Sequence, residues 1–471
     1  MNDILGTGTV LVTGAGVSGT GTHALLASLG AEAVLVDDRS TLPGVITTSA
    51  ASELLRQGSV SLLVTSPGWR PDSEIFTHAE EAGVEVIGDV ELAYRLDGVE
   101  VFGPRRTWLV VTGTNGKTTT TAMLADIMAL HAAASGQRAQ AVGNIGTAVS
   151  DALLATERID ILVAELSSFQ LHWSSQLHPD AGVLLNLAED HLDWHGSLAA
   201  YAADKAKVFV ADRPVAGMDD PLVLAEVNRT RPEGLVGFTA TEPAPGQVGV
   251  EDGRIIDRID GEPVDVCSVA GLQPPGPAGV LDALAATAVA RTQGVAPQTI
   301  ATALANFTVA GHRGAVVHRG DKQWIDNSKA TNPHAADAAL GAFDDSVIWI
   351  AGGQLKGADV DELLRTHAHR LSAVGLLGQD REVLAAAVEK HAPGVPVFVT
   401  EKTDPEAAMT ELVEFAHAQR GDTVLLAPAA ASLDMYTGMS QRGDLFTAAA
   451  ARLDRPDLPD SQPATVTEEK R

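Results

Sequence analysis

The beginning of the chain alternates short apolar runs with longer Ala/Leu-rich segments. Runs of β-branched and apolar residues at 10–13, 33–36 and 62–65 predict strands, and the segment 20–29 predicts a helix after the first of them. Strands and helices in this order are typical of a parallel α/β sheet. The alternation fades before residue 104, so residues 1–104 are predicted to form a first domain.

A second alternating block begins with a predicted strand at 108–112 and defines a central domain, residues 105–312. Within this domain, residues 212–277 differ in composition from their neighbours, because Pro and Gly are frequent. Two DG pairs, Asp252-Gly253 and Asp260-Gly261, stand between short apolar runs there. Such pairs favour tight turns between antiparallel strands. The segment is therefore predicted to be a β excursion within the central domain.

A third block of the same kind follows the central domain. Apolar runs at 347–351, 373–377 and 424–427 predict another open α/β sheet, and the domain is predicted to span residues 313–455. Residues 456–471 are polar, proline-rich and without periodicity, which predicts a disordered tail. The expected fold class is thus α/β with three domains.

Composition narrows the possible functions. The 471 residues include 33 Lys+Arg and 61 Asp+Glu, a formal net charge of −28 that repels polyanions, so no nucleic-acid partner is expected. The single Cys267 excludes a disulfide framework and a cysteine-built zinc site. The sequence shows no apolar run of about 20 residues and no signal peptide. A cytoplasmic protein without membrane insertion is expected.

The first predicted strand leads into a glycine-rich loop. The segment Gly14-Ala15-Gly16-Val17-Ser18-Gly19 matches G-x-G-x-x-G between a strand and a helix, and Asp37 ends the next strand. Glycines allow close backbone approach, and a helix N-terminus offers unpaired N–H groups to any diphosphate. A dinucleotide and a UDP-sugar both fit this pattern, and a tight turn without a ligand is the alternative.

A second loop gives a more specific signal. The predicted strand 108–112 runs into Gly113-Thr114-Asn115-Gly116-Lys117-Thr118-Thr119 and then a helical segment, which indicates a nucleotide triphosphate loop. Lys117 is expected to neutralise terminal phosphate oxygens, and the Thr118 hydroxyl is expected to bind Mg²⁺. The full G-x-x-x-x-G-K-[ST] pattern requires Gly at Val111, so the loop is a shortened variant.

Acidic and histidine residues after two buried strands supply candidate metal ligands. Glu165 ends the predicted strand 161–165 and is expected to be a second Mg²⁺ ligand. His191 and His195 in EDHLDWH have i,i+4 spacing, so a zinc hydrolase is considered. No glutamate is placed as in H-E-x-x-H and no cysteine ligand is present, which argues against zinc. His195 is interpreted as a solvated or capping histidine.

Together these motifs resemble the Mur ligase family. The resemblance covers residues 1 to about 455. It is carried by GTNGKTT at 113–119, GNIG at 143–146, ELSSFQL at 165–171, EDHLDWH at 189–195, Lys205 in YAADKAK, HRG at 312–314, SKATN at 328–332 and PAAASLDMY at 428–436. GTNGKTT alone would also fit the relatives that add alanine, diaminopimelate or lysine, and folylpolyglutamate synthase. ELSSFQ, ASLD and the dinucleotide-like first domain are similar to the D-glutamate-adding branch.

The resemblance implies a Rossmann-like UDP-binding domain, a central ATPase-type domain and a C-terminal Rossmann-like domain that binds the amino acid. It implies that ATP phosphorylates the terminal carboxylate of UDP-N-acetylmuramoyl-L-alanine (UDP-MurNAc-L-Ala), after which the amine of D-glutamate (D-Glu) attacks the acyl phosphate. ATP and two Mg²⁺ ions are the implied cofactors, these two small molecules are the substrates, and a monomer is expected. The implied role is cytoplasmic peptidoglycan precursor synthesis.

The resemblance also implies roles for single residues. The implied catalytic set consists of Lys117, Glu165, His191 and Lys205. The implied metal ligands are Thr118, Glu165, His191 and Lys205. The resemblance also implies that Lys205 carries a CO₂-derived carbamate. By its sequence context alone, Lys205 reads as an exposed helical lysine. The ATP set comprises residues 113–119 with Asp282, Arg313 and Asn327. The UDP-substrate set comprises Gly16, Val17, Ser18, Asp37, Asp38, Arg39, Pro67, Asn144 and Gln170, and the D-Glu set Lys329, Thr331, Lys356, Ser432 and Leu433.

Two positions depart from the family pattern. The central domain's last helix carries Ala278-Gly279-Val280-Leu281-Asp282 where the family often has HN-x-x-N, and Asp282 stands in place of the second asparagine. Asn327 stands where a carboxylate is common, with Asp326 one residue earlier. Neither change removes an expected metal or phosphate residue.

Two other classes compete with a ligase. An NAD-dependent oxidoreductase would explain the first glycine loop and Asp37, but it leaves the GKT loop and Glu165 without a role. A nucleotide-switched binding protein would explain the triphosphate loop, but not the second glycine-rich site.

Overall fold

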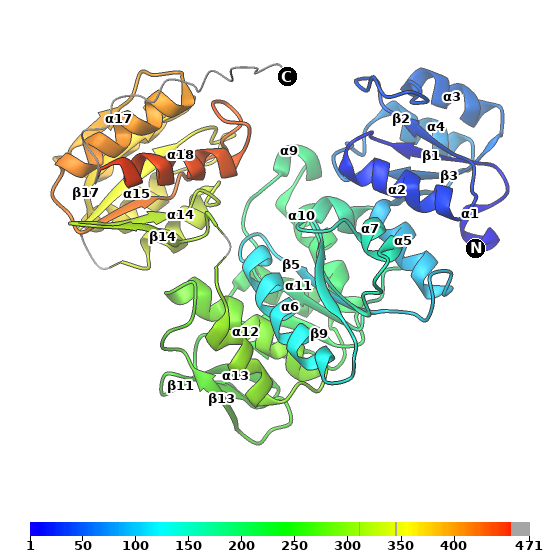
Figure 1. Ribbon diagram of the computed structural model, residues 1–471, viewed down its shortest axis with the longest axis horizontal. Coiled ribbons are helices and arrows are strands. Elements are labelled where there is room, and N and C mark those ends of the chain that lie inside the picture. Colours follow the sequence, from blue (N-terminus) through cyan, green and yellow to red (C-terminus); the bar gives the residue numbers. More distant parts are fainter. Residues whose placement is uncertain (310, 344–345, 454–471) are drawn as a thin grey trace, which may run out of the picture. The chain divides into compact units, whose positions relative to one another are not determined.

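The computed structural model describes residues 1–309, 311–343 and 346–453. The chain divides into two compact units, one of Met1–Gln273 with Ala278–Thr308 and one of Pro274–Pro277 with Val309–Arg471. The described residues form three sheets (Figure 1). The tail predicted at 456–471 lies outside the described residues, and the domain boundaries predicted at 104 and 312 stay predictions.

The first sheet is parallel, with the strand order β2-β1-β3-β4. Its strands are β1 (Thr9–Thr13), β2 (Ala33–Val36), β3 (Val60–Thr65) and β4 (Val86–Gly88). The helices are α1 (Asn2–Leu5), α2 (Val17–Ser28), α3 (Thr48–Arg56), α4 (Glu74–Glu81) and α5 (Asp89–Gly98). The three strands predicted from apolar runs are thereby confirmed. They form because β-branched side chains pack on both faces of a parallel sheet.

The central sheet has nine strands in the order β13-β12-β11-β10-β9-β8-β5-β7-β6. They are β5 (Thr107–Thr112), β6 (Ala139–Gly143), β7 (Ile161–Glu165), β8 (Ala181–Leu184), β9 (Pro214–Gly217), β10 (Val236–Phe238), β11 (Gln247–Glu251), β12 (Arg254–Asp257) and β13 (Val264–Ser268). The helices are α6 (Lys117–Ala133), α7 (Val149–Leu154), α8 (Ser168–His172), α9 (Leu192–His195), α10 (Leu198–Lys205), the 3₁₀ helix η1 (Ala206–Val210), α11 (Pro221–Thr230), α12 (Pro277–Thr292) and α13 (Pro297–Asn306).

The β excursion predicted at 212–277 contains the antiparallel end of this sheet. Strands β11, β12 and β13 pair antiparallel, and β11 and β13 carry labels at the lower end of Figure 1. Asp252 and Gly253 join β11 to β12 with φ of 50° and 72°. Positive φ at both central residues is what a tight hairpin turn requires, so the predicted hairpin is confirmed there.

The first two sheets share one apolar core, which includes Leu62 of β3 and Val110 of β5. Polar groups also join them: the indole nitrogen of Trp108 donates a 2.9 Å hydrogen bond to Asp97 at the end of α5. Arg106 pairs with the same buried carboxylate at 2.5 Å. This shared packing explains why the two sheets belong to one compact unit.

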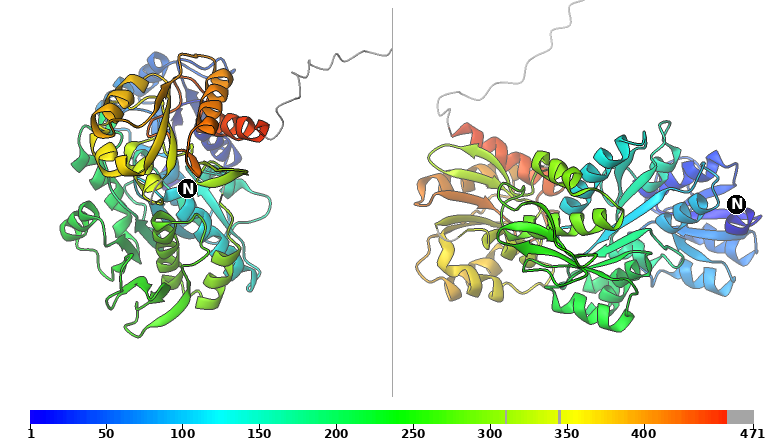
Figure 2. Two further views of the ribbon diagram at one scale, coloured as in Figure 1. Left: turned by 90° about the vertical axis from the view of Figure 1, so that its left-hand side faces the viewer. Right: turned by 90° about the horizontal axis from the view of Figure 1, so that it is seen from below.

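The third sheet belongs to the second unit and has the order β14-β15-β19-β16-β17-β18, with only the β14–β15 pair antiparallel among the described strands. Its strands are β14 (Ala315–Arg319), β15 (Gln323–Asp326), β16 (Val347–Gly352), β17 (Leu371–Leu377), β18 (Val397–Val399) and β19 (Thr423–Leu426). Two apolar clusters lie on its two faces, and Figure 2 shows helices on both sides of the sheet. The helices are α14 (Pro333–Leu340), α15 (Asp361–His367), the 3₁₀ helix η2 (Ala368–Arg370), α16 (Arg381–His391), α17 (Pro405–Ala418) and α18 (Met439–Arg452).

The order of the central strands positions the site. Strand β5 lies between β8 and β7, and all three run parallel. Their carboxyl ends therefore meet at one edge of the sheet, where ligands bind in open α/β folds. The loop after β5 is the predicted triphosphate loop, β7 ends in Glu165, and the loop after β8 leads to His191.

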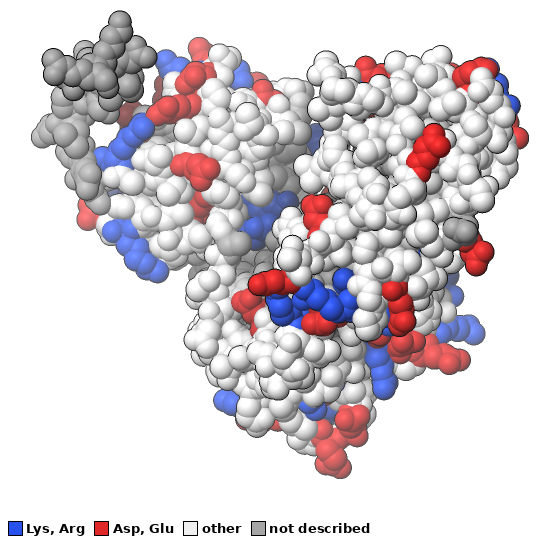
Figure 3. Space-filling view, turned by 45° about the vertical axis from the view of Figure 1, so that its right-hand side comes forward, with Lys and Arg blue, Asp and Glu red and all other residues white. Residues whose placement is uncertain are grey.

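Charge over the surface follows the composition. Figure 3 shows Asp and Glu side chains spread over the visible face, with Lys and Arg in a few small groups. In the described part of the chain, the helices lack the length and apolarity needed to cross a membrane.

Candidate active site

The loop after β5 has the geometry of a phosphate cradle. Gly116 precedes α6 with a φ of 80°, and a Cβ there would lie 2.3 Å from Oδ1 of Asp282, so only glycine fits. The Nζ of Lys117 donates to the carbonyl oxygens of Gly113 and Thr114 at 2.9 and 2.7 Å. The N-terminus of α6 thus combines backbone N–H groups, a lysine and the positive end of a helix dipole at one point.

Neighbouring segments hold this loop in place. Asn186 accepts a 2.8 Å hydrogen bond from the Asn115 N–H and donates one to the Asn115 carbonyl at 3.1 Å. The Thr114 hydroxyl lies 2.9 Å from the hydroxyl of Tyr201 and accepts a 2.9 Å hydrogen bond from the Ala188 N–H. Asn186 and Tyr201 were missed by sequence reasoning, since only the fold brings them to the loop.

Lys205 is buried at the same place, and its interpretation as an exposed helical lysine is wrong. Its residue exposure is 1 %, and Nζ donates to the Gly113 carbonyl at 2.8 Å. Burial, and next to it the ammonium of Lys117, holds the pKa of Lys205 well below its usual range, against the pull of the Asp190 and Glu165 carboxylates. The interpretation fails because the C-terminal end of α10, where Lys205 lies, packs inward toward β5.

Glu165 ends β7 with only 1 % of the residue exposed. Its Oε1 accepts a 2.8 Å hydrogen bond from the side-chain amide of Asn144. Its Oε2 is buried and has no hydrogen-bond partner among the residues that the structure describes. A buried carboxylate oxygen without a partner is costly unless a cation or donor occupies the space beside it.

His191 lies where the chain turns into α9, with a φ of 52°. Its ring packs edge-on against Phe169 with centroids 4.7 Å apart, and its Nε2 lies 3.5 Å from the Asp190 carboxylate. His195 is different, because its side chain is only 1 % exposed. The interpretation of His195 as a solvated or capping histidine is therefore wrong: its ring is buried between two polar partners, Asp204 and Ser168.

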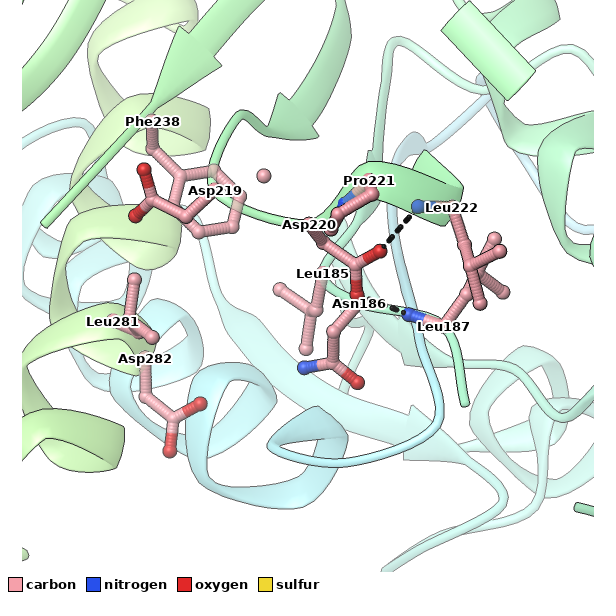
Figure 4. Close-up of a pocket in the computed structure, with 11 residues that line it drawn as sticks. Leu185, Asn186, Leu187, Asp219, Asp220, Pro221, Leu222, Phe238, Leu281 and Asp282 are labelled. Atoms are coloured by element: carbon pink, nitrogen blue, oxygen red, sulfur yellow. Dashed lines mark hydrogen bonds between the residues drawn. The ribbon is translucent and has the colours of Figure 1, made fainter. Parts of the chain in front are cut away.

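A cavity of ≈ 390 Å³ opens beside the phosphate loop. Phe238 and Leu281 give it an apolar wall, and Asp282 closes the side toward α6 (Figure 4). Asp220 shapes the opposite side, since its carboxylate accepts from the N–H groups of Leu222 and Leu187 at 2.8 and 2.9 Å. The Thr120 hydroxyl donates a 3.0 Å hydrogen bond to Asp282. Burial raises the pKa of Asp282 to about 7.

The glycine loop of the first sheet also has the expected shape. A Cβ at Gly19 would lie 1.7 Å from the Gly14 carbonyl, so the close approach of α2 to the loop requires glycine there. Asp37 accepts hydrogen bonds from the N–H groups of Ala15 and Arg39, both 2.9 Å, and these bonds lower the pKa of its carboxyl. Asp37 thus joins the loop to the end of β2.

The other residues predicted for the UDP substrate are distributed around this loop and β7. Val17 is 79 % exposed at the start of α2, the Ser18 hydroxyl donates to Asp89, and Asp38 accepts from the backbone and hydroxyl of Thr48. Gln170 uses its Oε1 to accept from the Ser167 N–H in a capping box of α8. Gly16, Arg39 and Pro67 lie in the turns after β1, β2 and β3.

The residues predicted for D-Glu lie in the second unit, at the carboxyl ends of its strands. Lys329 and Thr331 follow β15, Lys356 follows β16, and Ser432 and Leu433 follow β19. Ser432 is 4 % exposed and Leu433 is 70 % exposed. Arg313 precedes β14, and the Asn327 N–H donates a 2.9 Å hydrogen bond to Leu426 of β19.

Arg442 connects these loops and was missed by sequence reasoning. It is fully buried in α18 and donates to the carbonyl oxygens of Ser328, Gly352 and Ala430 at 3.0 to 3.2 Å. Burial lowers its pKa to about 10. Arg442 lies in a segment whose residue spacing is that of an amphipathic helix. This spacing does not indicate that a guanidinium is buried. Nothing in the sequence alone could have identified it.

Known proteins resemble this chain over most of its length. The sequence profile of the Mur ligase middle domain matches residues 111–290, and that of the Mur ligase, glutamate ligase domain matches residues 312–430. A protein of Corynebacterium diphtheriae named UDP-N-acetylmuramoylalanine--D-glutamate ligase is 55% identical over 460 residues, 94% of this chain and 96% of that protein. The chain belongs to the Mur ligase family. A protein of Mycolicibacterium smegmatis with the same name is 46% identical, over 93% of this chain and 96% of that protein.

Solved Mur ligase structures share the fold. UDP-N-acetylmuramate-alanine ligase MurC from Thermotoga maritima matches with a TM-score of 0.57 at 16% identity, over 95% of this chain and 99% of that chain. MurF ligase from the same organism, in complex with ADP, matches with a TM-score of 0.54 at 17% identity, over 96% of this chain and 100% of that chain. The α/β architecture expected from the sequence is therefore that of the family.

Proposed function

We propose that this protein is an ATP-dependent ligase that adds D-Glu to UDP-MurNAc-L-Ala in peptidoglycan synthesis. The observation that carries the proposal is the likeness, at 44 to 56% identity over most of the chain, to proteins that bear this activity in their name. The phosphate loop and the buried Lys205 beside it support the ATP-dependent part of the reaction.

The reaction brings two anions together. An oxygen of the substrate carboxylate attacks the terminal phosphorus of ATP, and ADP leaves. The amine of D-Glu then attacks the carbonyl carbon of the acyl phosphate, so that a C–N bond forms, phosphate leaves and the amine loses a proton. Lys117 and the N-terminus of α6 lower the cost of the first step by stabilising negative charge on the transferred group.

The residues present fit Mg²⁺, which would supply further charge neutralisation between the two anions. Glu165 presents a buried carboxylate oxygen that has no partner within the described part of the chain, and carboxylate oxygen is the ligand that a hard cation prefers. We propose that two Mg²⁺ ions are held by Thr118, Glu165, His191 and Lys205. Lys205 would do so as a carbamate, since its depressed pKa favours the neutral amine that reacts with CO₂, releasing one proton.

The remaining contacts follow from the positions of the loops. We assign the base of ATP to the cavity beside Asp282, because its apolar wall and polar rim suit a flat heterocycle. We assign the uridine diphosphate to the glycine loop of the first sheet and to Asp37. The side-chain carboxylate of D-Glu requires cations, and we assign it to Lys329 and Lys356 of the second unit.

A phosphate-release assay tests the proposal. Purified protein with ATP and Mg²⁺ should release phosphate only when UDP-MurNAc-L-Ala and D-Glu are both present. An NADH absorbance assay on the same preparation serves as the control for an oxidoreductase and should show no change. Phosphate release that ignores either substrate, or turnover of NADH, would contradict the proposed function.

A further inference from the structure

A partly buried cluster of polar side chains lies next to the proposed metal ligand Lys205. One carboxylate oxygen of Asp204 contacts two histidines: the Nδ1 of His172 at 2.8 Å and the Nδ1 of His195 at 3.2 Å. The opposite nitrogen of His195 lies 2.9 Å from the Ser168 hydroxyl. We call Asp204, His172 and His195 the Asp204 cluster.

The cluster joins three short helices. His172 is the last residue of α8, His195 is the last residue of α9, and Asp204 lies in α10. With five, four and eight residues, these helices make few backbone hydrogen bonds of their own. Side-chain contacts between them, together with the packing of Leu171 and Tyr201 in the apolar core, therefore help to hold their positions.

Each of these helices carries or follows one proposed active-site residue. Helix α8 begins at Ser168, shortly after Glu165, and α9 begins directly after His191. Helix α10 ends at Lys205, the neighbour of Asp204. A shift of α9 or α10 would therefore move His191 or Lys205 relative to Glu165, which is held at the end of β7 by pairing with β5 and β6.

Further contacts make the cluster rigid. Lys207 places its Nζ 3.1 Å from the other carboxylate oxygen of Asp204 and donates to the Leu171 and His172 carbonyls, both at 2.8 Å. The ring of His195 stacks on Phe169 with 9° between the planes, and Phe169 also contacts His191. The cluster thus reaches the side chain of a proposed metal ligand through one aromatic ring.

We propose that the Asp204 cluster positions His191 and Lys205 relative to Glu165 for the ligase reaction, an inference that rests on the proposed function. The cluster residues are positioning residues, since their contacts join them to α8, α9 and α10 and reach the phosphate loop through Tyr201, which packs against His195. Loss of the cluster should reduce the rate of the chemical step while the phosphate loop, built on β5 and α6, keeps its affinity for nucleotide.

The main test is Asp204→Asn, which keeps the side-chain shape and removes the charge. We expect kcat to fall about 10- to 100-fold, with KM for ATP and the affinity for ADP changed less than about two-fold. The matched control is Asp337→Asn, because Asp337 and His367 form a pair of the same 2.8 Å length in the second unit. We expect the control to keep the wild-type kcat.

A second pair of variants separates hydrogen bonding from packing. In His195→Asn, the amide nitrogen replaces Nδ1 and can still donate to Asp204, whereas His195→Ala removes the donor. We expect the Asn variant to have a kcat about five-fold higher than the Ala variant. If Asp204→Asn does not fold, His172→Phe provides the same test, because the His172 side chain is 32% exposed.

Several results would overturn the inference. A kcat for Asp204→Asn within about two-fold of the wild type would remove the positioning role. An equal loss in Asp337→Asn would show a general effect on stability. One zinc ion held per wild-type chain, and lost in Asp204→Asn, would make the cluster a metal site instead. A wild-type chain without D-Glu-dependent phosphate release would refute the proposed function, and the inference would fall with it.

Discussion

The Nζ of Lys205 donates a 2.8 Å hydrogen bond to the carbonyl oxygen of Gly113, the first residue of the phosphate loop. Nζ also lies 4.9 Å from the ring centroid of Tyr201, whose hydroxyl contacts Thr114 of the same loop. A lysine at the end of a short helix is thereby fixed against the backbone that would hold ATP. Replacement of the Lys205 side chain should therefore lower the rate of the reaction, which replacement of an exposed lysine would not do.

The first prediction concerns this lysine. Lys205→Met keeps most of the side-chain volume, so the fold should remain, but the amine that would carry the carbamate is lost. We expect nearly complete loss of phosphate release with a melting temperature close to the wild type. Removing CO₂ and bicarbonate during preparation should lower wild-type activity, and adding bicarbonate should restore it. A Lys205→Met enzyme with normal turnover would refute the carbamate role.

The second prediction concerns Lys117. Lys117→Ala removes the lysine at the N-terminus of α6, and we expect kcat to fall at least about 100-fold while the circular dichroism spectrum stays unchanged. Lys322→Ala is the matched control, since Lys322 also donates to a backbone carbonyl, that of Gln419 at 2.8 Å. Near-normal turnover in Lys117→Ala would show that the nucleotide site is misplaced.

The third prediction concerns the pH dependence of stability. Burial raises the pKa of Asp282 to about 7 from 3.8, so the folded chain holds a proton between these values that the unfolded chain has lost. The unfolding free energy should therefore decrease as pH rises from about 4 to about 7. Asp282→Asn should flatten this part of the curve.

Melting temperatures of the wild type and of Asp282→Asn, measured from about pH 5 to pH 8, check this prediction. The two proteins should differ most at the upper end of the range, where the wild type must bury a charge or take up a proton. Parallel curves would show that the Asp282 carboxyl titrates near its ordinary value.

The sequence predicted the strands and the phosphate loop but not the surroundings of the loop. Strands such as β7 were predictable because a run of β-branched and apolar residues is stable only in a buried sheet. The burial of Lys205 was not, since its helix shows the same residue pattern as an exposed one. Ser168, which contacts His195, is 27 residues away in the chain, and Ser328, which accepts from Arg442, is 114 residues away. Only the fold brings these residues together.

The fourth prediction concerns Arg442. Its guanidinium donates to the backbone carbonyls of Ser328, Gly352 and Ala430, which precede the proposed D-Glu residues in the chain, so Arg442→Met leaves buried acceptors unpaired. We expect a loss of about 3 kcal/mol in unfolding free energy and a higher KM for D-Glu. Thermal or urea unfolding and initial rates measure the two effects.

Arg452→Ala on the same helix is the control for this variant. Arg452 is 62% exposed and pairs with Glu406 at the surface, so its removal should change the unfolding free energy by less than about 0.5 kcal/mol. Equal effects of the two arginine variants would contradict a structural role specific to Arg442.

The most direct test of the central claim is identification of the product. Wild-type protein incubated with ATP, Mg²⁺, UDP-MurNAc-L-Ala and an equal mixture of isotopically distinguishable D-Glu and L-Glu should be followed by mass spectrometry and ADP release. We predict one amide-linked product that contains D-Glu, with one ADP formed per amide. A product that contains L-Glu equally, or ADP formed without an amide, would contradict the assignment of this chain as a D-glutamate ligase.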